Sequence, residues 1–145
     1  MATTDELLKT IQSKREIGSY LQDYAEDMIE FDLPAYLAEI LQKKNLKKAE
    51  AVAASGIDRT YCYQIFSGRK LPSRSKLLQL CIGMQLTIEE TQTLLKRTGF
   101  TQLYPRNKRD SIILFALENG MKVTDTDLLL DKHGLAPLNQ VGEEA

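Results

Sequence analysis

Two short helical segments that meet at a glycine constrain the fold of this chain more than any other feature. The first is predicted from about Lys47 to Ala54, and the second begins after Asp58 and ends near Phe66. The side chain of Asp58 can accept a hydrogen bond from the first turn of the second helix. Ser67-Gly68 can end that helix, because glycine adopts left-handed backbone angles without a steric penalty. Helices of this length are marginal in isolation, so they need other helices to pack against.

The residues around Gly56 have the sizes that a close crossing of two helices requires. Ala51 is small at the centre of the first helix, Gly56 allows a sharp turn, and Ile57 can fill the corner. On the second helix, Cys62 and Ile65 are spaced to face the first one. The spacing therefore predicts that these two helices pack tightly.

Helical periodicity also dominates the rest of the chain, and no segment alternates apolar and polar residues for long enough to predict a strand. At the N-terminus, Thr3 and Glu6 have the pattern of a capping box. The amphipathic stretch that follows reaches Phe31, with an irregular middle that leaves one helix or two open. Asp32-Leu33-Pro34 then predicts a new helix, since proline is tolerated in a first turn. The expected fold class is all-α.

The region after Pro72 contains two similar segments, 77–100 and 114–135. Each has a helix, a Gly-Met pair, and a threonine that is placed to cap a second helix. The predicted capping pairs are Thr87 with Glu90 and Thr124 with Asp127. We interpret the two segments as successive helical hairpins.

Charge is distributed unevenly along the 145 residues, although the formal net charge is only −1. Residues 1–33 carry eight acids and three bases, a local net of −5. Residues 47–76 carry seven bases and two acids, a net of +5, and residues 110–145 return to −5. A basic middle between acidic flanks would attract a polyanion to the helix pair around Gly56.

Several classes of protein are not expected from this sequence. Cys62 and Cys81 lack the spacing of a zinc site or a disulfide framework, so we interpret them as reduced core residues. No signal-peptide core and no run of roughly 20 apolar residues is present, so we expect a cytoplasmic protein without a membrane span. The one histidine, His133, lies near a helix end without a catalytic pair, a phosphate-binding loop or a metal-ligand cluster. We therefore expect no enzyme activity, no metal and no cofactor.

The stretch from 37 to 90 resembles the five-helix DNA-binding domain of the phage-repressor and Xre family, and the helix pair described above carries the resemblance. The resemblance implies a lambda-repressor-like helix-turn-helix bundle over residues 34–100. Residues 1–33 would then be an N-terminal helical extension, and residues 101–145 a C-terminal helical hairpin and tail. Val52 departs from the family, which usually carries alanine there, and this implies a slightly wider helix crossing or a local repacking.

The resemblance also implies roles for individual residues in binding double-stranded DNA. The second helix of the pair would be the recognition helix, with its first turns in the major groove. Arg59 could bind a guanine through two hydrogen bonds, and Gln64 could bind an adenine. The expected base contacts are Arg59, Thr60, Tyr61 and Gln64, with Tyr63 at the margin. The expected phosphate contacts are Lys48, Ser67, Arg69 and Lys70.

The function implied is a sequence-specific DNA-binding transcriptional regulator that acts as a homodimeric repressor. The apolar residues of the C-terminal hairpin either form the dimer surface or complete the core of the monomer. These residues are Leu114, Phe115, Leu117, Leu128, Leu129 and Leu130. The segment LYPRNKRD, residues 103–110, either extends the phosphate contacts or is a basic connector.

The competing interpretation is a protein-interaction module of the same fold. Tyr61 and Tyr63 suit a protein interface as well as DNA, because tyrosine is enriched at the energetic centres of protein interfaces. In this interpretation the chain is an antitoxin or an adaptor that binds a protein partner through the same face.

Overall fold

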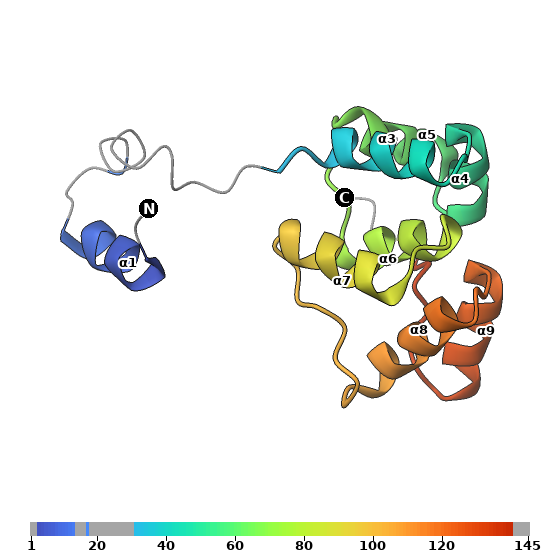
Figure 1. The fold of residues 1–145 in the computed structure, drawn as a ribbon. Coiled ribbons are helices and arrows are strands. Elements are labelled where there is room, and N and C mark those ends of the chain that lie inside the picture. The colour runs from blue at the N-terminus through green and yellow to red at the C-terminus, as the bar shows by residue number, and fades with distance from the viewer. Residues whose placement is uncertain (1–2, 14–16, 18–30, 141–145) are drawn as a thin grey trace. The chain divides into compact units, whose positions relative to one another are not determined.

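The computed structural model describes residues 3–13, 17 and 31–140, and every regular element among them is a helix. The all-α prediction is therefore confirmed for this part of the chain. No helix in the described ranges has the length and apolar content needed to cross a bilayer. The helices are α1 (Thr4–Ser13), α3 (Leu33–Lys43), α4 (Lys48–Ser55), α5 (Arg59–Ser67), α6 (Arg74–Gly83), α7 (Ile88–Arg97), α8 (Lys108–Glu118) and α9 (Val123–Lys132) (Figure 1).

The chain divides into two compact units, Met1–Phe31 and Asp32–Ala145. In the first unit, α1 begins with the predicted capping box: the N–H of Glu6 donates to Thr3 Oγ1 at 3.2 Å, and the N–H of Thr3 donates to Glu6 Oε2 at 3.4 Å. Most of the predicted amphipathic stretch after α1 lies outside the described residues.

The second unit is built from three layers of helices (Figure 1). The first layer holds α3, α4 and α5, and α4 crosses α6 in the middle layer. The middle layer, α6 and α7, in turn packs against α8 and α9, which form the third layer. The helix pair around Gly56 thus packs on α6, which in turn packs against α7 and α9.

Helix boundaries around the pair follow from the side chains that were predicted to cap them. Asp32 Oδ1 accepts a hydrogen bond from the N–H of Ala35 at 3.1 Å, so Asp32 caps the start of α3 as predicted. Asp58 Oδ2 accepts one from the N–H of Tyr61 at 3.0 Å and opens α5. Gly68, with φ of 86°, ends α5 in the left-handed conformation.

The connections α3–α4, α6–α7 and α8–α9 share one geometry. Each has a residue with φ between 54° and 59°, followed by an apolar residue whose N–H donates back to a carbonyl of the preceding helix. The left-handed residues are Asn45, Gln85 and Gly120, and the apolar residues are Leu46, Leu86 and Met121. The two hairpins predicted after Pro72 are present as α6–α7 and α8–α9, and the α3–α4 connection has the same backbone geometry.

The predicted residue-by-residue equivalence of the segments 77–100 and 114–135 is wrong at two positions. Gly83 is the last residue of α6, whereas Gly120 lies beyond the end of α8 as the left-handed residue, so the two Gly-Met pairs are not equivalent. The box of Thr87 with Glu90 is confirmed at the start of α7. Thr124 does not cap α9, because that helix already begins at Val123.

Asp127, the predicted partner of Thr124, has a different function in the structure. Its carboxylate accepts hydrogen bonds from the N–H groups of Leu138 at 2.6 Å and Asn139 at 3.3 Å. Leu138 is fully buried, so these bonds fix the segment after α9 against the third layer. The acid at this position therefore anchors the end of the described chain instead of completing a capping box.

Both cysteines are free, buried core residues, as predicted. Burial raises the pKa of the Cys81 thiol to about 12. Burial also raises the pKa of Cys62, although a hydrogen bond with Ser55 acts in the opposite direction. Thiols in this state are protonated and therefore unreactive at neutral pH.

Glu90 links the first layer to the start of α7. Its carboxylate lies 3.1 Å from Lys44 Nζ and 3.6 Å from Lys43 Nζ, and it accepts a hydrogen bond from the N–H of Thr87 at 2.8 Å. Burial acts to raise the pKa of Glu90, but the hydrogen bonds from Thr87 and Lys44 and the charge of Lys44 together lower it below its ordinary value. The ionised carboxylate is therefore the form that stabilises the fold.

We expect Glu90→Gln to lower the free energy of unfolding by about 1 kcal/mol at pH 7. Because the pKa is lower in the folded state, the contribution is complete above the unfolded value of about 4.3 and is lost as the pH falls through the folded value. Urea unfolding followed by circular dichroism should show the difference at pH 7, and the difference should shrink as the pH falls below about 4. The exposed neighbour provides the control, Glu89→Gln, and an equal loss in both variants would contradict this role for Glu90.

Candidate nucleic-acid interface

The first turn of α5 presents polar side chains to solvent. Arg59 and Thr60 are exposed, and Tyr63 and Gln64 are half-buried one turn further along. The Arg59 guanidinium lies 5.8 Å from the centre of the Tyr63 ring, within the distance of a cation–π contact. Three of the four predicted base-contacting side chains are thus accessible on one helix.

Tyr61, the fourth, belongs to the core instead. Its side chain is 7% exposed, its hydroxyl donates to the Leu71 carbonyl at 3.3 Å, and Lys76 Nζ lies 5.5 Å from its ring centre. The physical reason is helical spacing, because Tyr61 is four residues from the buried Ile65 and shares its inward face. Its side chain is not exposed for the base contact that we expected, so we leave it out of the proposed contacts.

The predicted phosphate contacts flank α5 on both sides. Lys48 begins α4 and is exposed, with its Nζ 5.9 Å from the Phe66 ring centre. Ser67, Arg69 and Lys70 are exposed at the end of α5. The N–H groups of Arg69 and Lys70 both donate to the Gln64 carbonyl, at 2.9 and 3.2 Å, so the backbone that carries these two cations is fixed to α5.

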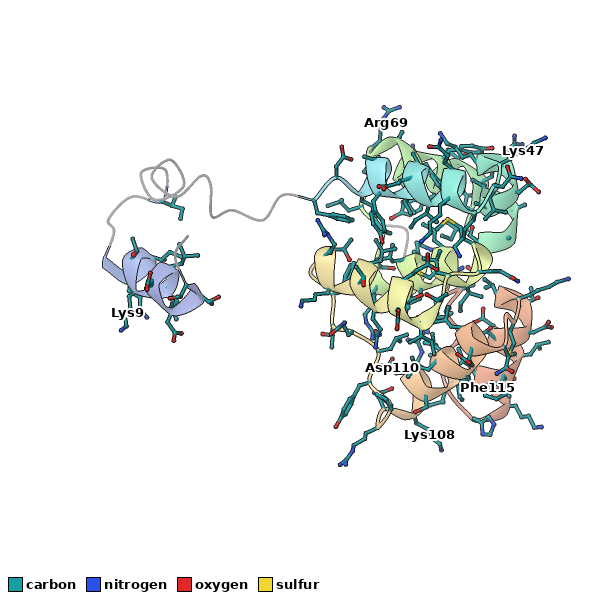
Figure 2. All side chains as sticks on the ribbon, viewed as in Figure 1. Lys9, Lys47, Arg69, Lys108, Asp110 and Phe115 are labelled. Carbon is teal, nitrogen blue, oxygen red and sulfur yellow. The ribbon has the colours of Figure 1, made fainter. Side chains whose placement is uncertain are left out.

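Lys47 is a cation of this surface that the sequence analysis did not assign. It is exposed next to Lys48, and Figure 2 shows Lys47 and Arg69 at the same end of the second unit, on the layer of α3, α4 and α5. Among the described residues, none of the cations of this surface forms an ion pair with an acid. These cations are Lys47, Lys48, Arg59, Arg69 and Lys70.

Fewer of the bases in residues 47–76 are available at the surface than the sequence suggests. Lys76 is fully buried, and Arg74 is paired with Asp110 at 3.3 Å. Five of the seven bases therefore remain to attract a polyanion, and all five lie at the ends of α4 and α5.

A family model described as helix-turn-helix matches residues 37–90. The match spans α4, the turn at Gly56 and α5. Residues 37–90 are a helix-turn-helix domain of the Cro/C1, Xre-like type. Domains of this type bind DNA in transcriptional regulators. No curated protein and no solved structure matches the chain.

The segment 103–110 does not extend the cationic surface of the helix-turn-helix domain. Figure 2 shows Lys108 at the end of the second unit that is opposite Lys47 and Arg69. Arg109 has a structural contact, because its guanidinium donates to the carbonyls of Ala136 and Pro137 at 2.9 and 3.1 Å. The segment connects the second and third layers and does not add to the phosphate contacts beside α5.

The apolar residues of the C-terminal hairpin are divided between the core and the surface. Leu117 and Leu130 are buried, while Leu114 and Leu129 are half-buried. Phe115 and Leu128 are 56% and 68% exposed. Part of the predicted set thus closes the core behind the helix-turn-helix domain, and two large side chains remain outside it.

Proposed function

We propose that this protein is a sequence-specific transcriptional regulator that represses by occluding a promoter, with α5 as its recognition helix. The observation that carries the proposal is the set of exposed cations without acidic partners on both sides of the exposed first turn of α5. A recognition helix in the major groove needs this arrangement, because phosphates flank the groove on either side.

The proposed base contacts are Arg59, Thr60 and Gln64, with Tyr63 in place of Tyr61. Arg59 would bind a guanine through two hydrogen bonds, and Gln64 an adenine. The ring of Tyr63 orders the Arg59 side chain, which reduces the entropy lost on binding. The proposed phosphate contacts are Lys47, Lys48, Ser67, Arg69 and Lys70.

We propose further that the regulator binds as a homodimer. A single recognition helix offers a small contact, and two half-sites about one helical turn apart would supply the missing affinity. The exposed Phe115 and Leu128 are candidate dimer contacts. Light scattering at micromolar concentration should give a dimer mass in the presence of operator DNA, and a monomer mass with and without it would contradict this part of the proposal.

Salt dependence tests the DNA contacts directly. Each phosphate contact contributes about 0.9 to the slope of log affinity against log salt. The triple variant Lys48→Ala, Arg69→Ala, Lys70→Ala should therefore flatten the slope by roughly 2 to 3 and weaken binding to all sequences by at least about tenfold. Fluorescence anisotropy between 50 and 200 mM salt measures both quantities.

The control for this variant removes an exposed lysine at the end of α9, Lys132→Ala. An unchanged slope in the triple variant would contradict DNA binding through this surface. The protein-interaction function would then be favoured by the groove between α4 and α5, which Ala49, Val52 and Tyr63 line. In that case Tyr63→Ala should abolish partner binding without affecting the fold.

A further inference from the structure

The connector between α7 and α8 has a backbone that is held in place almost residue by residue. The side-chain amide of Gln92 accepts from the N–H of Leu103 at 2.7 Å and donates to its carbonyl at 2.9 Å. The N–H of Tyr104 donates to Asp110 at 3.0 Å, and the N–H of Asn107 donates to the Tyr104 carbonyl at 2.9 Å. The loop therefore has one defined conformation.

This rigid loop presents side chains that contribute nothing to the core. All five residues from Tyr104 to Lys108 are exposed, and the Tyr104 side chain is 56% exposed. Among the described residues, neither Arg106 nor Lys108 forms an ion pair. An exposed aromatic ring followed by two cations on a backbone held by hydrogen bonds is a preorganised surface, and it loses little entropy on binding.

The surroundings of the loop are also cationic. Residues 96–109 contain five bases and no acid. The first acid after them, Asp110, has its charge compensated by Arg74, whose guanidinium donates to both carboxylate oxygens at 3.4 and 3.3 Å. Asp110 therefore does not neutralise Arg106 or Lys108.

We propose that Tyr104, Arg106 and Lys108 form a second nucleic-acid contact, which binds the sugar-phosphate backbone of a segment other than the one bound by α5. Cations that bind phosphates beside an aromatic ring that can stack on a base or a sugar are the chemistry of sequence-independent nucleic-acid binding. The second segment is required by geometry, because Lys108 lies at the opposite end of the unit from Lys47 and Arg69 (Figure 2). The protein would thus join two segments of nucleic acid, one bound by α5 and one by the loop. The joining rests on the proposed function of α5, whereas binding by the loop does not.

The test uses the full chain with the α5 surface removed by Arg59→Ala, Arg69→Ala and Lys70→Ala. Its binding to a labelled 20-base-pair duplex of random sequence, and to a single strand of the same length, is measured by fluorescence anisotropy at low salt. Adding Arg106→Glu and Lys108→Glu should weaken the residual binding at least tenfold. The matched pair Lys122→Glu and Lys132→Glu changes the same charge elsewhere and should weaken it less than threefold.

Each other outcome overturns the proposal. An absence of residual binding, or an equal loss with both pairs, would mean that the loop has no specific contact. Tighter binding of polyglutamate than of either nucleic acid would identify an acidic protein surface as the ligand instead. If the proposed function is wrong, removing the α5 surface will not weaken DNA binding by the whole chain, while the effect of the loop variants stays measurable. Circular dichroism should show unchanged folding, because both substituted loop residues are exposed.

Discussion

Replacing Asp110 by alanine should lower the free energy of unfolding by about 3 kcal/mol. The Asp110 side chain is 10% exposed and binds the Arg74 guanidinium and the N–H of Tyr104. Arg74 also donates to the carbonyls of Thr101 and Gln102, at 2.9 and 3.4 Å. One carboxylate thus joins α6, the connector and α8, and its removal leaves a partly buried guanidinium without its counter-charge.

Guanidinium chloride unfolding followed by circular dichroism measures this loss. The control is Asp131→Ala, because Asp131 is exposed on α9 and its substitution should change stability by less than about 0.5 kcal/mol. A loss below about 1 kcal/mol for Asp110→Ala would mean that the pair with Arg74 contributes little to the attachment of the third layer.

Replacing Gly83 by alanine should lower the free energy of unfolding by about 2 kcal/mol, although alanine favours a helix over glycine by about 1 kcal/mol. A Cβ atom at Gly83 would lie 2.9 Å from the backbone C of Ala54 and the backbone N of Ser55. Backbone atoms cannot rotate away as a side chain can, so α4 and α6 would have to separate. Because α4 supports α5, we expect DNA affinity to fall as well.

The control for this steric effect is Gly99→Ala. Gly99 has φ of 83° and no atom within 4 Å of the position of a Cβ, so its loss of about 1 kcal/mol would come from the left-handed backbone, a cost that the helical Gly83 does not carry. Chemical unfolding and duplex anisotropy on both variants separate the two effects. A stabilising Gly83→Ala substitution would show that helix propensity outweighs the close approach.

Local signals in the sequence were sufficient to predict most helix boundaries. Asp58 and Gly68 predicted the two ends of α5, and Thr87 with Glu90 predicted the start of α7. These features depend on side chains that form hydrogen bonds to the backbone within three or four residues. Both partners therefore lie in the same short stretch of sequence and can be recognised together.

Features that depend on distant partners were not predictable in the same way. Lys76 counted as a surface charge in the sequence, but it lies beneath the ring of Tyr61 from another helix. Arg74 was counted similarly, and its partner Asp110 is 36 residues away. Tyr61 is a different case, because its spacing of four residues from Ile65 already indicates the inward face of α5, whereas the family resemblance implies a base contact.

Selection of bound sequences from a random pool of duplex DNA tests most directly whether α5 reads base edges. The whole chain and its Arg59→Ala variant are compared at low and at physiological salt. We predict that the whole chain enriches a pseudo-palindromic DNA sequence. The DNA selected by the variant should lose the preference for guanine at one position in each half-site, and the variant should bind the original site about 1 to 3 kcal/mol more weakly. No enrichment at either salt concentration, from protein shown to be folded, would contradict the account.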